Sequence, residues 1–550
     1  MNQEMPPIEA CLIGGLDAWG DDNSTVVDAF IPTGAYRALA ERHRCFLCGR
    51  RGSGKSAIAV MSKGMGGWDH PEVVRGEVEQ YGEYMALVED LVERKYYGLA
   101  VDVKRAIAAA WRYALRVLVL QATLRAAEQA GERATDAAEP ITYYLTSKSL
   151  GDKRIGDVLY EVFGRAMAAL HPSKPSVLDF FASLNSVTSD GAFKSAVSSV
   201  RKVLRGRTVL IILDTLESYK IYDEAMRQGL RGIVGTIIEM LSDEALRGVG
   251  IRFFLPAEIF EDISAEIPAK TQAVTIYLHW RSGDLIAMLA RRYLDMLERN
   301  QFLSATEIAS LRQLVSRSVI AIGTGASGRP LRTEFWYASG FLPLSVKNRN
   351  GKKEDCFAFI LRHTQRKPRE LIWVLNQIIR KAHERGELPR ISAEAVTEGI
   401  HDHETLHLLL SDALSPYEGY VHNVVDRARA IFFGRARVMT GKQLRQFAEA
   451  LYEVGPVNGI SAVDFVRFLL RTGVVGLVRD SDLTADPSRL YCRVSYEYLM
   501  LDQVAFSSDR LYYVHPVMGD CFHMQHNSEF GSAYPMPEKG DLEKDLGLSD

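Results

Sequence analysis

A glycine-rich segment, Gly49–Ser56, has the sequence GRRGSGKS and follows the pattern G-x-x-x-x-G-K-[ST]. Because glycine lacks a Cβ, it adopts backbone angles that other residues disfavour, and successive N–H groups can then converge on an anion. The lysine of this pattern can reach the outer phosphates of a nucleotide, and the final hydroxyl can bind Mg²⁺. The sequence predicts phosphate contacts from Gly49, Arg50, Arg51, Gly52, Ser53, Gly54, Lys55, Ser56 and Ala57.

The residues on either side of this segment favour the order strand, loop, helix. Arg44–Cys48 is typical of a short buried strand, and Lys55–Ser62 predicts the start of a helix. That order brings the positive end of a helix dipole to the bound anion. A glycine-rich surface turn is the alternative interpretation of the segment.

A second apolar run, Thr208–Leu213, ends in Asp214, and Glu217 follows three residues later. A continuous apolar run of this length is typical of a buried parallel strand, and ligands bind at the carboxyl ends of such strands. We therefore expect Ser56 and Asp214 to hold Mg²⁺, and Glu217 to orient the attacking water. An ordinary core strand that ends in a solvated aspartate is the alternative.

The composition describes an ordinary globular chain. It has 550 residues, enough for about three or four domains, with 47% hydrophobic and 25% charged residues and a formal net charge of −3. A nearly neutral chain has no general attraction to nucleic acid or to an anionic membrane, so such contacts need a local patch. We interpret Cys45 and Cys48 as buried apolar residues rather than metal or redox ligands, and find no metal-ligand spacing among the 13 histidines.

The sequence favours a cytoplasmic location without membrane contact. The N-terminal residues lack the basic region and apolar core of a secretory signal. The most apolar helical stretch, Ala106–Gln121, is interrupted by Arg112 and Arg116. This argues against a membrane-spanning segment, which needs roughly 20 apolar residues.

The order of elements predicts an α/β fold with a parallel-sheet core in residues 41–280. Further strands are expected at Gly250–Leu255 and Val274–Leu278, and residues 66–205 look almost entirely helical and are interpreted as an insertion. We expect residues 1–40 to pack on this core. Residues 281–410 are again predicted to be helical.

Residues 411–525 show the order of a winged helix. Helices are predicted at Lys442–Glu453 and Ser461–Thr472, followed by strands at Gly473–Val478, Tyr491–Ser495 and Leu511–Val514. The polar and acidic residues 526–550 are predicted to be a disordered tail.

Together these pieces resemble the P-loop ATPases of the STAND and origin-recognition (ORC-type AAA+) group, in particular bacterial members linked to stress and phage defence. The resemblance covers most of residues 25–520. It rests on Gly49–Ser56 and on four further segments, which are Leu210–Glu217, Trp280–Leu285 with Arg291 and Arg292, His363–Leu371, and Tyr512–Pro516.

The resemblance implies a P-loop NTPase core with a helical lid (281–410) and a C-terminal winged helix. It implies an ATP- and Mg²⁺-dependent switch that forms homo-oligomers and signals to a protein effector or sensor. Arg369 matches the lid arginine that touches the γ-phosphate, and Arg291 or Arg292 matches a lid or trans-acting arginine.

Two departures from the family's pattern bear on hydrolysis. The second signature usually has two adjacent acids, whereas Thr215 follows Asp214 here. The strand at Ile251–Leu255 normally ends in a polar residue that senses the γ-phosphate, and here Pro256-Ala257-Glu258 follows it. We expect ATP binding, with turnover that is slow or absent if Glu217 cannot orient water.

Two other functions remain open from the sequence. The chain can be an ATP-binding scaffold without turnover. It can also be a DNA-binding ATPase of the initiator or transposition-helper type, in which winged-helix arginines meet phosphates. Those arginines are Arg467, Arg471, Arg479, Arg489 and Arg493, and the alternative is a solvated face, because Asp464, Asp480, Asp482 and Asp486 lie among them.

Overall fold

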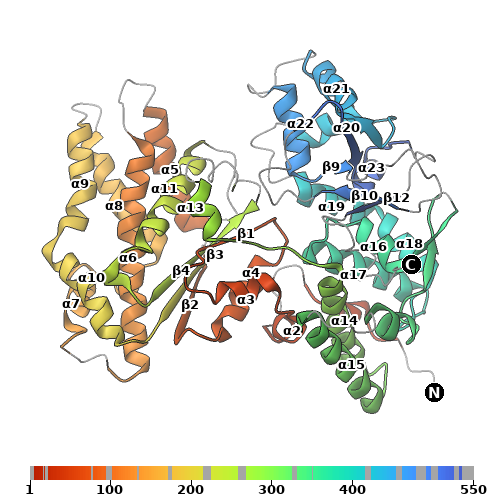
Figure 1. Cartoon of the computed structure of the whole chain (residues 1–550), viewed down its shortest axis with the longest axis horizontal. Coiled ribbons are helices and arrows are strands. Elements are labelled where there is room, and N and C mark those ends of the chain that lie inside the picture. Colours follow the sequence, from red (N-terminus) through yellow and green to blue (C-terminus); the bar gives the residue numbers. More distant parts are fainter. Residues whose placement is uncertain are drawn as a thin grey trace. The chain divides into compact units, whose positions relative to one another are not determined.

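The computed structural model describes residues 5–15, 18, 23–75, 78–94, 102–132, 136–170, 176–214, 224–257, 260, 268–324, 331–349, 351–414, 423–453, 461–478, 491–496, 506–525 and 532–535. The chain forms two compact units (Figure 1). The sheet unit comprises Ala35–Arg51 and Ile58–Leu278, and the C-terminal unit comprises Met1–Gly34, Gly52–Ala57 and His279–Asp550.

The sheet unit is an α/β structure built on five parallel strands in the order β2-β3-β4-β1-β5. These strands are β1 (Phe46–Gly49), β2 (His70–Arg75), β3 (Val209–Asp214), β4 (Val249–Pro256) and β5 (Thr275–Tyr277). Every residue of β1 and β3 is buried, as expected for inner strands with both faces covered. The predicted α/β class and the four strands predicted from apolar runs are confirmed.

Strand β2 was not predicted. The sequence predicts an almost entirely helical stretch at residues 66–205, but His70–Arg75 pairs along its whole length with β3. The strand lies at the edge of the sheet, where a proline is tolerated, and Pro71 is one of its residues. Its Glu72 forms an ion pair with Arg125. Four of its six residues are polar or proline, so the strand gives no continuous apolar signal.

Most of the described residues between 78 and 240 that lie outside β3 are helical. The helices are α5 (Val78–Arg94), α6 (Val103–Gln129), α7 (Glu139–Ser147), α8 (Ile155–Met167), α9 (Val177–Ser189), α10 (Gly191–Leu204) and α11 (Glu224–Met240). Short helices α3 (Gly34–Leu39), α4 (Lys55–Met61) and α13 (Pro268–Ala273) adjoin the strands.

Helix α6 is the core element of this helical part. Among the described residues it is the single helix whose length and composition would suit a membrane span. Its most apolar 18-residue stretch is 83% buried inside the protein. Its Tyr113 hydroxyl lies 2.8 Å from the Tyr144 hydroxyl of α7, and both rings pack against Phe193 of α10. Burial against other helices accounts for the apolar composition that the sequence shows.

The C-terminal unit has a large helical core. It is formed by α14 (Ser282–Arg299), α15 (Ala305–Thr324), α16 (Cys356–Arg362), α17 (Pro368–Glu384), α18 (Ala393–His401) and α19 (His403–Leu414), with a π-helical turn at Arg332–Tyr337 and a hairpin of β6 (Ser345–Lys347) and β7 (Lys353–Asp355). Helices α14 to α19 lie in residues 281–414, which agrees with the helical structure predicted for residues 281–410.

The N-terminal residues contact this helical core. The N-terminal helices are α1 (Ile8–Cys11) and α2 (Asn23–Ala29). The N–H of Ile13 donates to Asn376 Oδ1 of α17 at 2.9 Å, and Arg292 of α14 donates to the Ile13 carbonyl at 3.0 Å. The sequence predicts that residues 1–40 pack on the 41–280 core. Those before Ala35 instead belong to the C-terminal unit, and Ala35–Arg51 belong to the sheet unit.

In the last part of the chain, the described residues form four helices and a five-stranded sheet in the order β12-β10-β9-β11-β8. The helices are α20 (Val424–Phe432), α21 (Gly441–Glu453), α22 (Ala462–Arg471) and α23 (Pro516–Cys521). The strands are β8 (Val438–Thr440), β9 (Val475–Val478), β10 (Tyr491–Ser495), β11 (Leu511–Val514) and β12 (Ser532–Pro535). The two helices and three strands predicted within 442–514 are confirmed.

Strand β12 corrects the prediction that residues 526–550 are wholly disordered. Ser532–Pro535 pairs in parallel with Tyr491–Val494 of β10. This pairing uses backbone groups at the edge of the sheet, which a four-residue sequence without alternation does not reveal. Residues 536–550 lie outside the described residues.

Candidate functional site

The glycine-rich segment joins a buried strand to a helix. β1 ends at Gly49, and α4 begins at Lys55, so the expected order strand, loop, helix is observed. Gly52 and Gly54 have φ angles of +76° and +92°. Residues with a Cβ rarely adopt these angles, so the turn depends on glycine at both positions.

Polar side chains in this loop are buried. The exposed fractions are 6% for Arg50, 5% for Ser53 and 1% for Lys55. The Oγ atom of Ser53 is buried without a hydrogen-bond partner among the described residues. Buried polar groups are normally satisfied, so a hydroxyl of this kind points to a ligand contact or a strained loop.

Two residues from the helical core of the C-terminal unit hold the second half of the loop. The indole Nε1 of Trp280 donates to the Ser53 carbonyl at 2.7 Å, and the N–H of Arg369 donates to the Gly52 carbonyl at 3.3 Å. A Cβ on Gly52 would lie 3.2 Å from Arg369 Cβ, and one on Gly54 would lie 3.5 Å from the Trp280 ring. Both glycines therefore also permit close approach.

Arg369 lies in the first turn of α17. Its Nη1 is 3.5 Å from Asp412 Oδ1 of α19. Lys367 lies beside it, with Nζ 3.0 Å from Glu370 Oε1 and 3.8 Å from Asp412 Oδ2. Two cations and two acids thus balance one another at the N-terminus of α17.

Asp214 is the last residue of β3, and it is 9% exposed. Only β4 separates β3 from β1, and all three strands are parallel, so Asp214 and Gly49 end at the same edge of the sheet. The chain leaves β1 toward β2 and leaves β4 toward β5, which is the opposite direction along the sheet. With right-handed crossovers these connections cover opposite faces, and such a switch point is where open α/β sheets bind ligands.

Two acids that the sequence analysis considered lie outside the described residues. Glu217 was predicted to orient water, and Glu258 was the polar residue nearest the end of the β4 strand. The last described residue before Glu217 is Asp214, and the last one before Glu258 is Ala257. The water-orienting role of Glu217 stays a prediction.

Arg291 and Arg292, which the resemblance matched to a lid or trans-acting arginine, hold the N-terminal segment. Arg291 Nη1 donates to the Phe30 carbonyl, and burial lowers the pKa of its guanidinium. Arg292 is 7% exposed and donates to Ile13, as described above. Both arginines thus have structural partners within their own chain.

The winged-helix arginines of the DNA-binding alternative are only partly described. Arg467 of α22 is exposed, and its Nη1 lies 3.2 Å from Asp464 Oδ1, which matches the solvated-face interpretation at this position. Arg479 and Arg489 lie outside the described residues, and of Arg493 only the backbone is described.

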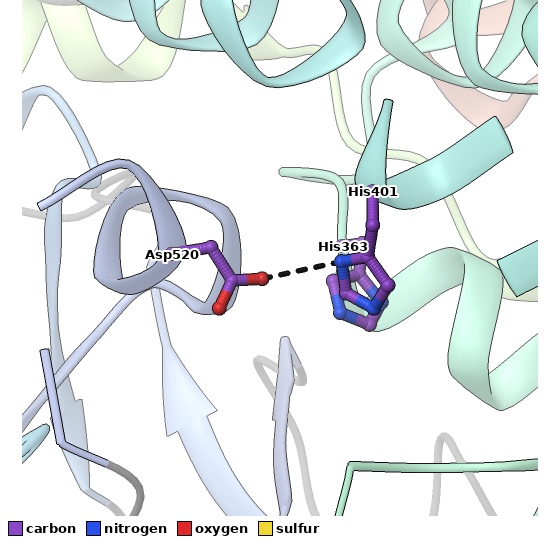
Figure 2. A group of neighbouring side chains, drawn as sticks. All are labelled: His363, His401 and Asp520. Carbon is purple, nitrogen blue, oxygen red and sulfur yellow. Dashed lines mark ion pairs between the residues drawn. The ribbon is translucent and has the colours of Figure 1, made fainter. Parts of the chain in front are cut away.

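The structure brings together three residues that sequence reasoning missed, namely His363, His401 and Asp520 (Figure 2). Their ligand-type atoms all lie within 4.8 Å of one another, and His401 Nδ1 is 3.4 Å from Asp520 Oδ2. His363 Nδ1 lies 2.7 Å from the Phe359 carbonyl, which fixes that nitrogen as the donor. Because 38 and 119 positions separate the three residues along the chain, no local spacing announces them.

The charges around this cluster favour an ionic network over a metal site. Asp520 Oδ1 accepts hydrogen bonds from Arg437 at 2.5 Å and from Arg349 at 2.8 Å. Burial, together with the charge of Arg362, lowers the pKa of His363 well below its usual value, so its imidazole is neutral. Two guanidinium groups on Asp520, the carboxylate of this cluster, would repel a bound cation and already satisfy the acid.

A second pattern missed in the sequence is His403-Glu404-Thr405-Leu406-His407, which has the form H-E-x-x-H and begins α19. Both histidine rings are exposed and nearly parallel, with centroids 6.4 Å apart. Catalytic zinc sites take three protein ligands. Among the described residues no third histidine, cysteine or acid groups with this pair, so it does not complete such a site.

Comparisons with protein-family models, with curated proteins and with solved structures gave no match to this chain. The candidate site therefore rests on the loop between β1 and α4, on the residues that hold it, and on the acid at the end of β3.

Proposed function

We propose that this protein is an ATP-binding molecular switch. The observation that carries the proposal is the turn from β1 into α4, with two glycines at positive φ and a buried lysine, Lys55, as the first residue of the helix. Converging N–H groups and one ammonium group suit a polyphosphate, whose several negative charges must be offset by donors. The unpartnered Ser53 hydroxyl supports the same assignment.

The proposed roles follow the chemistry of phosphoryl groups, in which positioning and charge neutralisation dominate. The backbone of Gly49–Ser56 would hold the β- and γ-phosphates, with Lys55 offsetting their charge. Ser56 and Asp214 would hold Mg²⁺, which supplies further charge neutralisation when bound. The presence of Asp214 at the carboxyl edge of the sheet that carries the loop supports this metal role.

We place the fold in the P-loop NTPase class, with residues 281–410 as a helical lid and 411–525 as a winged helix. The parallel sheet, the helical core of 281–410 and the order of helices and strands in 442–514 support these finer assignments.

Homo-oligomerisation, a protein partner, a cytoplasmic location and a role in bacterial phage defence follow from the resemblance and belong to the proposal. Size measurements with ATP, with ADP and without nucleotide test the oligomer.

Hydrolysis is proposed to be slow. Arg369, the candidate for γ-phosphate contact, pairs with Asp412, so it must exchange this partner before it can bind a phosphate oxygen. Glu217 would orient water. Steady-state phosphate release distinguishes a slow ATPase from an ATP-binding scaffold without turnover.

The central test is an ATP titration of Lys55→Ala, with Lys63→Ala as the matched control. Lys63 is an exposed lysine just after α4. Hydrogen bonds to charged groups contribute roughly 1.5–3 kcal/mol, so we expect ATP affinity to fall about 10-fold to 150-fold in Lys55→Ala. The control should bind like the wild type. Unchanged affinity in Lys55→Ala would overturn the assignment of the loop.

A further inference from the structure

We infer that the segment between α16 and α17, His363–Lys367, couples the nucleotide loop to the end of α22 in the C-terminal part of the chain. The inference rests on the proposed function and names the route by which nucleotide state would be transmitted. We call these five residues the connecting segment. They carry the sequence HTQRK, which composition alone would place at the surface.

The connecting segment is buried along its whole length. The exposed fractions are 2% for His363, 1% for Thr364, 3% for Gln365, 2% for Arg366 and 4% for Lys367. Burying five consecutive polar residues is costly unless their groups are paired. Their partners therefore show what the segment is built to hold.

One end of the segment contacts the residues that hold the loop. Arg366 Nη2 donates to the Trp280 carbonyl at 2.5 Å, and Trp280 Nε1 donates to the Ser53 carbonyl at 2.7 Å. Two residues beyond the segment, the Arg369 N–H reaches the Gly52 carbonyl. A change in the positions of the Gly52 and Ser53 carbonyls thus acts on the first turn of α17, which follows the segment, and on Trp280, to which Arg366 of the segment is bonded.

The other end contacts the C-terminal part of the chain. Gln365 Nε2 donates to the carbonyls of Thr472 at 3.1 Å and of Gly473 at 3.2 Å. Thr472 is the C-cap residue of α22, and Gly473 leads toward β9. His515, the N-cap residue of α23, lies with Nε2 3.2 Å from the Thr364 carbonyl. Adjacent residues of one short segment thus contact the loop's supports and two helix ends.

The backbone of the segment is held under strain. Arg366 has a φ of +56°, which for a residue with a side chain costs about 1–2 kcal/mol. The N–H of Gln365 donates to Glu370 Oε2 of α17 at 2.5 Å, so the helix start fixes the strained turn. Gln365 Oε1 is buried without a hydrogen-bond partner among the described residues. A strained segment with an unsatisfied polar group can shift between two hydrogen-bonding arrangements. Coupling between two sites requires an element of this kind.

The coupling can be measured by hydrogen exchange in the full chain with and without ATP–Mg²⁺. In the wild type we expect ATP to change exchange rates of amides in Phe468–Gly473 by at least about five-fold, the lower end of typical coupling energies. Gln365→Met keeps the volume of the side chain and removes both hydrogen bonds to Thr472 and Gly473. We expect it to bind ATP within about two-fold of the wild type, because the side-chain hydrogen bonds of Gln365 go to Thr472 and Gly473 and not to the loop or to Trp280.

In Gln365→Met the ATP-induced change at Phe468–Gly473 should be lost. Gln446→Met, on the exposed face of α21, is the matched control and should keep it. If Gln365→Met does not fold, Trp280→Phe serves instead, because it removes the bond to Ser53 and should reduce the response at saturating ATP.

The outcomes separate this inference from the proposed function. ATP binding by the wild type without any exchange response at Phe468–Gly473 would overturn the coupling alone. So would a full response in a folded Gln365→Met or Trp280→Phe protein. Failure of the wild type to bind ATP would overturn the proposed function, and the inference with it.

Discussion

The backbone N–H of Arg369 donates a 3.3 Å hydrogen bond to the carbonyl oxygen of Gly52, and the two residues also pack against one another. The start of α17 is thereby tied to the glycine-rich turn. Neither can move far without breaking a bond in a buried region, where an unmade hydrogen bond costs about 1–3 kcal/mol. The loop and the helix start should therefore respond together to substitutions at either place.

Gly52→Ala tests this relationship directly. Alanine would be strained at a φ of +76°, and its Cβ would lie 3.2 Å from Arg369 Cβ, tighter than ordinary contact. The left-handed angle alone costs about 1–2 kcal/mol, so we expect ATP affinity to fall roughly 5-fold to 30-fold in an equilibrium titration. Gly34→Ala, at a position with open space, is the control. Equal affinities of the two variants would contradict the prediction.

The elements that the sequence predicted well are those with a local signal. β1, β3 and β4 are continuous apolar runs, and α14, α17 and α22 show helical periodicity, so each is recognisable within its own segment. β2 and β12 are edge strands whose pairing depends on a distant neighbour. Their own residues carry no alternating pattern, and so they were missed.

The same distinction applies to the candidate site. The loop is a contiguous motif, and the pattern located both glycines that have a positive φ. Trp280 and Asp412 reach the loop region from more than 200 positions away along the chain, and no local sequence pattern indicates these contacts. The cluster of His363, His401 and Asp520 likewise exists only through the packing of α18 and α23 beside α16.

A pair of glycines on α11 tests the packing of the sheet unit. A Cβ on Gly232 would lie 3.0 Å from Ile107 Cγ2 and 3.1 Å from the Ala108 nitrogen of α6, whereas one on Gly235 meets nothing within 4 Å. Gly235→Ala should stabilise by roughly 0.5–1 kcal/mol through helix propensity. In Gly232→Ala, overpacking costs about 1–3 kcal/mol and should cancel or reverse that gain. Denaturant unfolding measures both, and identical midpoints would refute close packing of α6 on α11.

Asp520→Asn tests the ionic network in the C-terminal unit. Removing one partner of a buried charge pair costs roughly 3–5 kcal/mol, and Arg437 and Asp520 have side chains only 5% and 3% exposed. We expect the free energy of unfolding at pH 7 to fall by about 3 kcal/mol, measured with denaturant. Asp509→Asn, at an exposed turn, should change it by less than about 0.5 kcal/mol. Similar small losses in both variants would count against a stabilising network.

The pH dependence of this effect has a definite sign. Burial alone would raise the pKa of the Asp520 carboxyl, but the hydrogen bond from His401 and the charges of Arg437 and Arg349 outweigh it and hold this pKa well below its usual range. A depressed carboxyl pKa contributes stability that is present above the unfolded-state value of about 3.9 and is lost as the pH falls below it. The stability difference between wild type and Asp520→Asn should therefore be constant above about pH 5 and shrink below pH 4.

Asp412→Asn tests how Arg369 distinguishes ATP from ADP. Arg369 Nη1 lies 3.5 Å from Asp412 Oδ1, and the two side chains are 26% and 14% exposed. An ion pair this exposed contributes up to about 1 kcal/mol, so removing the acid should make the guanidinium easier to recruit and raise ATP affinity about two-fold to five-fold. ADP affinity should change less, because ADP has no γ-phosphate for Arg369 to contact.

Arg369→Ala should weaken ATP binding more than ADP binding, and titrations of both nucleotides against both variants check this. A parallel shift for ATP and ADP in either variant would show that Arg369 acts on the shape of the loop, through Gly52, and does not contact the γ-phosphate.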